Sequence, residues 1–165
     1  MLEGNDYTII QPQEKLLACG DIGNGALAEP SEIFFEVAKV LLKEDFWEKR
    51  PVLVTGGGTR EKIDEVRYLS NFSSGKMAKA LSLSLYLKGA DVCYITSMGC
   101  EGLPESIDTI DVNDTEELFN VTQDAINRKK KASKNNPDNR QQFKNKGPFI
   151  IKNKLPLNPR INKVG

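Results

Sequence analysis

The chain has 165 residues, of which 39% are hydrophobic, and its 23 basic residues balance its 23 acidic ones. This length predicts one domain with a modest core. The sequence contains no histidine, which excludes histidine-based nucleophilic catalysis and histidine metal ligands. Three cysteines (Cys19, Cys93 and Cys100) indicate reduced thiols rather than a disulfide framework. No apolar run approaches the roughly 18 residues of a membrane span, and no signal-peptide pattern opens the chain, so we expect a cytoplasmic location.

The neutral net charge conceals two unlike regions. Residues 128–165 hold twelve Lys or Arg and a single acid, Asp138, whereas residues 1–127 hold eleven basic and 22 acidic residues. A change this sharp indicates a boundary near Arg128.

The first 30 residues show little helical periodicity. Tyr7, Ile9 and Ile10 predict a short strand that ends at Pro12, and residues 17–25 then read as a glycine-rich loop. On composition alone, the cysteine in this loop is a small buried thiol of a surface turn. A helix is predicted from Pro30, since proline suits the first helical turn. Apolar residues at helical spacing predict that this helix has a buried stripe: Ile33, Phe34, Val37, Val40 and Leu41.

The next stretch combines a strand, a glycine bend and a helix start. Residues 52–54 form a short apolar run, and residues 56–77 read GGGTREKIDEVRYLSNFSSGKM. Consecutive glycines after a strand let an anionic ligand approach backbone N–H groups, and the hydroxyls and cations that follow suit a phosphate. Neither G-x-G-x-x-G nor G-x-x-x-x-G-K-[ST] is present, so the glycines alone fit an ordinary strand-to-helix turn equally well.

Alternating elements continue up to residue 127. A helix is predicted from near Ser73 to Leu87, with Ser73 or Ser74 as the N-cap and Gly89 as the stop. Residues 91–96 and 107–112 read as buried strands, which makes Cys93 a core residue. A further helix follows, capped by Asp114 and Glu117. The pattern predicts an α/β fold with a Rossmann-like, doubly wound parallel sheet that is incomplete and is followed by a disordered basic tail.

The order of residues in the glycine stretch closely resembles the core signature of phosphopantothenate–cysteine ligase, also called phosphopantothenoylcysteine synthetase. In bacteria that enzyme is usually the C-terminal half of a bifunctional coenzyme A biosynthesis protein. The matching elements are Gly57-Gly58-Thr59-Arg60, Ile63-Asp64, Val66-Arg67-Tyr68, Ser70-Asn71 and Ser73-Ser74-Gly75-Lys76-Met77.

A second resemblance lies upstream. Residues 18–30, ACGDIGNGALAEP, resemble the last conserved loop of phosphopantothenoylcysteine decarboxylase, in which the cysteine matching Cys19 protonates the decarboxylated enethiolate. The flavin-binding body of that decarboxylase precedes this loop in the family, whereas only eighteen residues precede Cys19 here. We therefore expect FMN to have no site in this chain and Cys19 to be chemically idle in it.

The resemblance implies an acid–amine ligation. The carboxylate of 4′-phosphopantothenate attacks the α-phosphate of CTP, and the amine of cysteine then displaces CMP from the acyl-cytidylate. Asn71 would contact the acyl group and Arg67 the pantothenate side, while Mg²⁺ screens the phosphates without a protein ligand assigned to it. Asp64 and Tyr68 either contribute to the site or only shape the loop. The residues expected around the nucleotide are Gly57, Gly58, Thr59, Ser73, Ser74, Gly75 and Lys76. A homodimer is the expected assembly, with neither membrane nor nucleic acid as a partner.

The sequence divides into three segments. The resemblance implies that residues 1–30 are a remnant of the decarboxylase substrate loop and that residues 31–127 are the first part of the ligase nucleotide-binding domain. Residues 128–165 are expected to form a Lys/Asn-rich tail without a recognisable fold. Only residues 149–151 of the tail are a candidate strand. The tail is either a basic arm that binds nucleic acid or out-of-frame translation, which we favour because the family match ends abruptly.

Three questions of function stay open at this point. The nucleotide is CTP or ATP. The chain is either an active ligase or a non-catalytic remnant that binds a nucleotide or phosphate. An NAD(P)-binding Rossmann domain is a weaker alternative, because no acid ends the second strand to hold a ribose.

Overall fold

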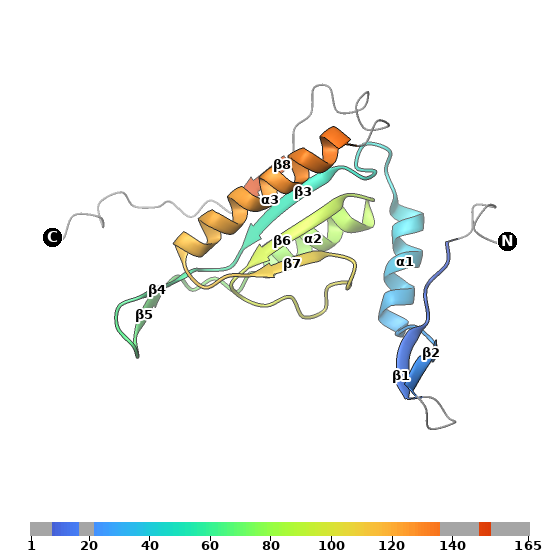
Figure 1. Cartoon of the computed structure of the whole chain (residues 1–165), viewed down its shortest axis with the longest axis horizontal. Coiled ribbons are helices and arrows are strands. Elements are labelled where there is room, and N and C mark those ends of the chain that lie inside the picture. Colours follow the sequence, from blue (N-terminus) through green and yellow to red (C-terminus); the bar gives the residue numbers. More distant parts are fainter. Residues whose placement is uncertain (1–7, 17–21, 136–148, 153–165) are drawn as a thin grey trace.

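A four-stranded parallel sheet forms the centre of the protein (Figure 1). The computed structural model describes residues 8–16, 22–135 and 149–152. The strands lie in the order β7-β6-β3-β8. Their bounds are Pro51–Gly56 for β3, Asp91–Thr96 for β6, Asp108–Asp111 for β7 and Phe149–Lys152 for β8.

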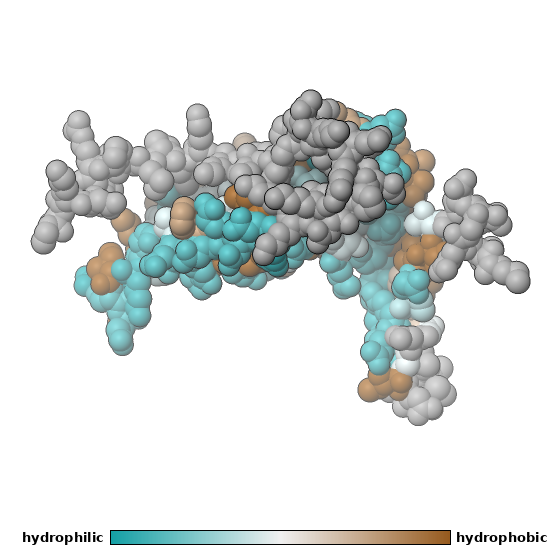
Figure 2. Space-filling model, turned by 45° about the horizontal axis from the view of Figure 1, so that its top comes forward, coloured by the Kyte–Doolittle hydropathy of each residue, from teal (hydrophilic) through white to brown (hydrophobic). Residues whose placement is uncertain are grey.

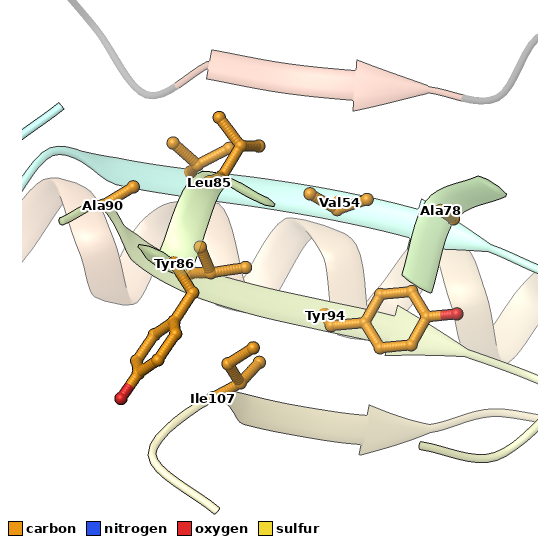
Figure 3. Close-up of a cluster of buried hydrophobic side chains, with 9 residues drawn as sticks. Val54, Ala78, Leu85, Tyr86, Ala90, Tyr94 and Ile107 are labelled. Carbon is orange, nitrogen blue, oxygen red and sulfur yellow. The ribbon is translucent and has the colours of Figure 1, made fainter. Parts of the chain in front are cut away.

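Helices cover both faces of this sheet, as expected for a doubly wound fold. The helices are α1 (Pro30–Leu42), α2 (Lys76–Leu87) and α3 (Thr115–Asn135). On one face, side chains of α2 pack on alternate residues of β3 and β6, and this core cluster is drawn in Figure 3. On the other face, the intervening strand residues pack against α3. The α/β, Rossmann-like prediction is therefore confirmed.

The strand alternation explains why each face is apolar. Val52 and Val54 point towards α2, whereas Leu53 between them points towards α3 with Cys93. Cys93 is 1% exposed, which confirms its prediction as a core residue, and burial raises the pKa of its thiol to about 12. A strand buried on both faces reads as a continuous apolar run, which is why the sequence identified these strands.

The sheet has a topological switch point beside β3. From β3 the chain runs outward through β6 to β7, and then returns through α3 to β8 on the other side of β3. In open α/β sheets, ligands bind at the carboxyl ends of the strands at such a point. The glycine bend follows β3 directly and therefore lies at this switch point.

Two small antiparallel ribbons flank the domain. Near the N-terminus, β1 (Gln13–Leu16) pairs with β2 (Ile22–Ala26) beside α1. The second ribbon is the hairpin of β4 (Arg60–Lys62) and β5 (Tyr68–Ser70), which projects away from the sheet (Figure 1). Within the described residues, no helix is long and apolar enough to cross a membrane.

The N-terminal predictions are partly wrong. The predicted strand at Ile9 and Ile10 is not formed, because strand pairing begins after Pro12, and the predicted loop includes strand β2. Tyr7 and Cys19 lie outside the described residues.

The predicted buried stripe of α1 is also wrong. The helix has no buried residue, and Phe34 and Leu41 are 65% and 77% exposed. Only Phe35 packs against the core, because α1 lies along the side of α2 rather than over the sheet. Figure 2 shows hydrophobic surface at the α1 end of the molecule. Helical spacing predicted an apolar face, but not whether another element of the chain covers it.

Two boundaries differ from the sequence-based expectation. Helix α2 begins at Lys76 with Gly75 as N-cap, rather than at Ser73. Helix α3 continues through residues 128–135, and the one candidate strand of the basic region forms β8 beside β3. These parts of residues 128–165 thus belong to the Rossmann-like domain, which differs from the expectation of a tail without a fold.

Candidate functional site

The glycine bend turns the chain at the carboxyl end of β3. Gly57 has a φ of +95°, a conformation that residues with a side chain rarely adopt. A Cβ at this position would also lie 2.5 Å from the Ser97 hydroxyl and 2.7 Å from Cγ of Met98. Both backbone angle and space therefore require glycine here.

The end of β6 supports the bend from the neighbouring strand. The Ser97 hydroxyl donates a 2.8 Å hydrogen bond to the carbonyl of Gly58, and the backbone N–H of Met98 donates to the hydroxyl of Thr96 at 3.0 Å. Sequence reasoning missed these residues. The observation that could have identified them is the parallel pairing of β3 with β6, because it places the residues after each strand side by side.

Helix α2 presents its N-terminus to the same place. Gly75, the N-cap, has a φ of +66°, and no side chain caps the helix. The first N–H groups of a helix carry partial positive charge and bind anions when they are left uncapped. Lys76, the first helical residue, is exposed and adds a full positive charge. This end of α2 is therefore suited to a phosphate.

Asn71 lies beside the bend. A Cβ at Gly58 would be 3.5 Å from Cβ of Asn71 and 2.9 Å from its carbonyl oxygen. That carbonyl also accepts a 2.8 Å hydrogen bond from the backbone N–H of Ser73. The side chains of Asn71 and Ser74 are exposed. The structure thus brings Asn71, the glycine bend and the segment leading into α2 together.

Arg67 lies elsewhere, at the tip of the β4–β5 hairpin. Its guanidinium pairs with the carboxylate of Asp64 at 2.5 Å. Asp64 also accepts hydrogen bonds from the backbone N–H groups of Val66 and Arg67, at 2.9 and 2.8 Å. The guanidinium and these N–H groups lower the pKa of Asp64. Asp64 therefore shapes the hairpin turn, one of the two roles that the sequence left open.

The base of the hairpin is anchored to the start of α3. The Thr59 hydroxyl is 3.0 Å from that of Thr115, and Glu61 accepts hydrogen bonds from the hydroxyl and the backbone N–H of Thr115. The backbone N–H of Arg60 donates to the carbonyl of Asn113 at 2.7 Å. Thr59 thus contacts α3 from its place beside the bend, and this anchor holds the hairpin relative to the sheet.

The predicted residues therefore divide into three groups. Most of those assigned to the nucleotide, together with Asn71, surround the carboxyl end of β3. Arg67 is at the hairpin tip, and Cys19 is outside the described residues. In the described part of the chain, no group of three or more His, Cys, Asp or Glu residues could hold a metal ion.

Comparison with known proteins assigns a family to this arrangement. The family model described as DNA/pantothenate metabolism flavoprotein C-terminal domain matches residues 47–134. The Haemophilus influenzae coenzyme A biosynthesis bifunctional protein CoaBC is 34% identical over 121 residues, which are 73% of this chain and 30% of that protein. A cysteine/cysteine sulfinic acid decarboxylase from an unknown prokaryotic organism is 35% identical over 131 residues, 76% of this chain and 36% of its own.

One solved structure aligns with part of this chain. The crystal structure of the C-terminal domain of the coenzyme A biosynthesis bifunctional protein CoaBC aligns with a TM-score of 0.44 and 28% identity, over 66% of this chain and 46% of its own. The chain spans about a third of the length of the two curated relatives described above. Because the family model matches more than half of the sequence, this chain belongs to the family of the DNA/pantothenate metabolism flavoprotein C-terminal domain.

Proposed function

We propose that this chain is the first part of a ligase domain that joins 4′-phosphopantothenate to cysteine in a CTP-dependent step of coenzyme A biosynthesis. The protein it represents would be bifunctional, with another half that decarboxylates phosphopantothenoylcysteine and binds FMN. One observation carries the proposal. The glycine bend, the uncapped N-terminus of α2 and Asn71 lie together at the switch point of the sheet.

The chemistry has two steps. A carboxylate oxygen of 4′-phosphopantothenate attacks the α-phosphorus of CTP, and the bond to pyrophosphate breaks. The cysteine amine then attacks the acyl carbon, CMP leaves with the bridging oxygen, and the amine loses a proton to solvent. Such steps depend on positioning and on stabilising charge that develops on phosphate and acyl oxygens.

The chain's residues divide this work. Backbone N–H groups of Gly57 and Gly58 and of the first turn of α2 would face the phosphates, with Lys76 as a mobile cation. Ser73, Ser74 and Thr59 add hydroxyl donors, and the Asn71 amide would donate to the acyl oxygen. Magnesium would arrive with the phosphates. Arg67 would contact the pantothenate side only from the hairpin tip.

The proposed assembly is a homodimer through the β4–β5 hairpin. Four exposed apolar side chains lie in this hairpin or directly after it: Val66, which is 89% exposed, Phe72, which is fully exposed, Ile63 and Leu69. Apolar patches of this kind mark interaction sites. In sedimentation velocity, Val66→Ser with Phe72→Ser should shift the protein towards monomer, whereas Phe119→Ser on α3 should not. A wild-type monomer at all concentrations would contradict the dimer.

Pyrophosphate release tests the reaction. The wild-type chain should release pyrophosphate only when CTP and 4′-phosphopantothenate are both present, and should form the amide when cysteine is added. Asn71→Asp should lose this activity, because it replaces the N–H donor with a negative charge. Asn120→Asp, exposed on α3, is the matched control and should keep it. Equal activity in wild type and Asn71→Asp would refute the role of Asn71.

Calorimetric titrations with CTP, pyrophosphate and NAD(P)H separate the alternatives. A chain that binds CTP or pyrophosphate without turnover is a non-catalytic remnant. A chain that binds NAD(P)H but not CTP is a dinucleotide-binding domain, although β6 ends at Thr96 without an acid for the ribose. Comparing CTP with ATP decides the choice of nucleotide.

A further inference from the structure

Tyr94, on β6, has a hydroxyl group that the hydrophobic core does not explain. The residue is 0% exposed, and its hydroxyl oxygen has no hydrogen-bond partner within the described part of the chain. A buried hydroxyl without a partner costs stability that phenylalanine would not cost. Such a group calls for a role other than packing.

The Tyr94 hydroxyl lies where the two halves of the candidate site meet. In Figure 3 it points past Ala78 towards the end of the sheet to which the strands run. A Cβ at Gly56 would be 3.0 Å from the hydroxyl oxygen, and a Cβ at Gly75 would be 3.6 Å from it. The hydroxyl therefore lies between the start of the glycine bend and the N-cap of α2.

Met98 lies beside this place. A Cβ at Gly75 would be 3.3 Å from Cβ of Met98, and a Cβ at Gly57 would be 2.7 Å from its Cγ, so the methionine lies against both glycines. Its side chain is 39% exposed and unbranched, with three rotatable bonds. Rotation of Met98 away from the glycines would uncover the space above the hydroxyl.

We propose that the Tyr94 hydroxyl donates a hydrogen bond to a phosphate oxygen of the nucleotide, which enters between the glycine bend and α2 when Met98 moves aside. The inference rests on the proposed function, since it assigns one further donor to the same site. A hydroxyl that donates to a charged phosphate oxygen gains a short, charge-assisted bond, which compensates for its burial.

Tyr94→Phe tests the proposal, with Tyr86→Phe as the matched control. Both tyrosines are buried, but the hydroxyl of Tyr86 already donates to Glu36 at 2.6 Å. Binding of CTP with Mg²⁺, and of inorganic pyrophosphate, would be measured by calorimetry, and thermal unfolding would be followed without ligand. Tyr94→Phe should weaken both ligands about ten-fold. It should unfold no earlier than wild type.

The control should behave in the opposite way, with earlier unfolding and unchanged affinity. Equal affinity of wild type and Tyr94→Phe would overturn the inference while leaving the proposed function intact. Weaker binding accompanied by clearly earlier unfolding would also overturn it, because the hydroxyl would then be structural. A wild-type protein that binds neither CTP nor pyrophosphate would refute both the inference and the proposed function.

Discussion

The hydroxyl of Ser97 donates a 2.8 Å hydrogen bond to the carbonyl oxygen of Gly58, 39 residues earlier in the chain. This bond joins the residue after β6 to the bend after β3. It holds the Gly58 carbonyl towards β6. The residue after the neighbouring strand thus holds the glycine bend, which has no side chains with which to hold itself in place.

Ser97→Ala should loosen the glycine bend. We expect a loss of about 1 kcal/mol in the free energy of unfolding, the usual net contribution of such a bond. We also expect weaker CTP binding, because the bend would no longer be preorganised. Urea unfolding and calorimetry measure the two effects. Ser84→Ala, exposed on α2, is the control and should change neither. Unchanged CTP affinity in Ser97→Ala would show that the bend does not depend on this bond.

Comparing Gly57→Ala with Gly102→Ala separates the cost of backbone strain from the cost of a steric clash of the added Cβ. Both glycines have positive φ, +95° and +79°, but a Cβ at Gly102 would meet nothing within 4 Å, whereas one at Gly57 would strike Ser97 and Met98. Gly102→Ala should therefore cost only the strain, about 1 kcal/mol. Gly57→Ala should cost up to about 3 kcal/mol and abolish CTP binding. Equal losses in denaturant unfolding would mean that the β6 end moves aside freely.

Local pattern was enough to predict the central strands of the sheet. Residues 52–54 and 91–96 are predicted as strands because they are apolar nearly throughout, and both lie within observed strands. The glycines and Asn71 were selected together from one continuous stretch. The structure places them side by side, because a short hairpin returns the chain to the bend.

The remaining features depend on contacts between distant segments. Nothing near Ser97 or Tyr94 in the sequence marks them as neighbours of the bend, and only the parallel pairing of β3 with β6 brings them there. The stripe of α1 was misjudged for a related reason. Periodicity reports an apolar face, but whether Phe34 is covered depends on where the helix docks. Serine is a favoured N-cap, yet α2 starts later, because Gly75 takes the left-handed conformation at the cap.

Asp64 predicts a pH dependence of the hairpin tip. Its pKa is lowered from 3.8, first by the Arg67 guanidinium and then by the N–H groups of Val66 and Arg67. A lowered carboxyl pKa means that the ionised form stabilises the folded turn, so this contribution is lost as pH falls through the folded pKa. The NMR shifts of the Val66 and Arg67 amides should therefore titrate with a midpoint below pH 3.8.

Asp64→Asn removes the charge and provides the control for that titration. Its Val66 and Arg67 amides should show no such transition, and salt should weaken the effect in wild type because the pair is exposed. A wild-type midpoint at or above 3.8 would mean that the ion pair does not form in solution.

Tyr86 predicts a loss of stability at alkaline pH. Its hydroxyl donates to Glu36 across the α1–α2 contact at 2.6 Å. Burial, followed by this carboxylate, raises its pKa from 10.0 to about 12. The folded state thus favours the protonated phenol, so the contribution is complete below pH 10 and is lost as pH rises towards 12.

Tyr86→Phe should cost about 1 kcal/mol at neutral pH, since the pair is partly open to solvent. The difference in unfolding free energy between wild type and Tyr86→Phe should then shrink between pH 10 and 12. Urea unfolding at a series of pH values measures this difference, and a constant difference across the series would show that Tyr86 titrates alike in the folded and unfolded chain.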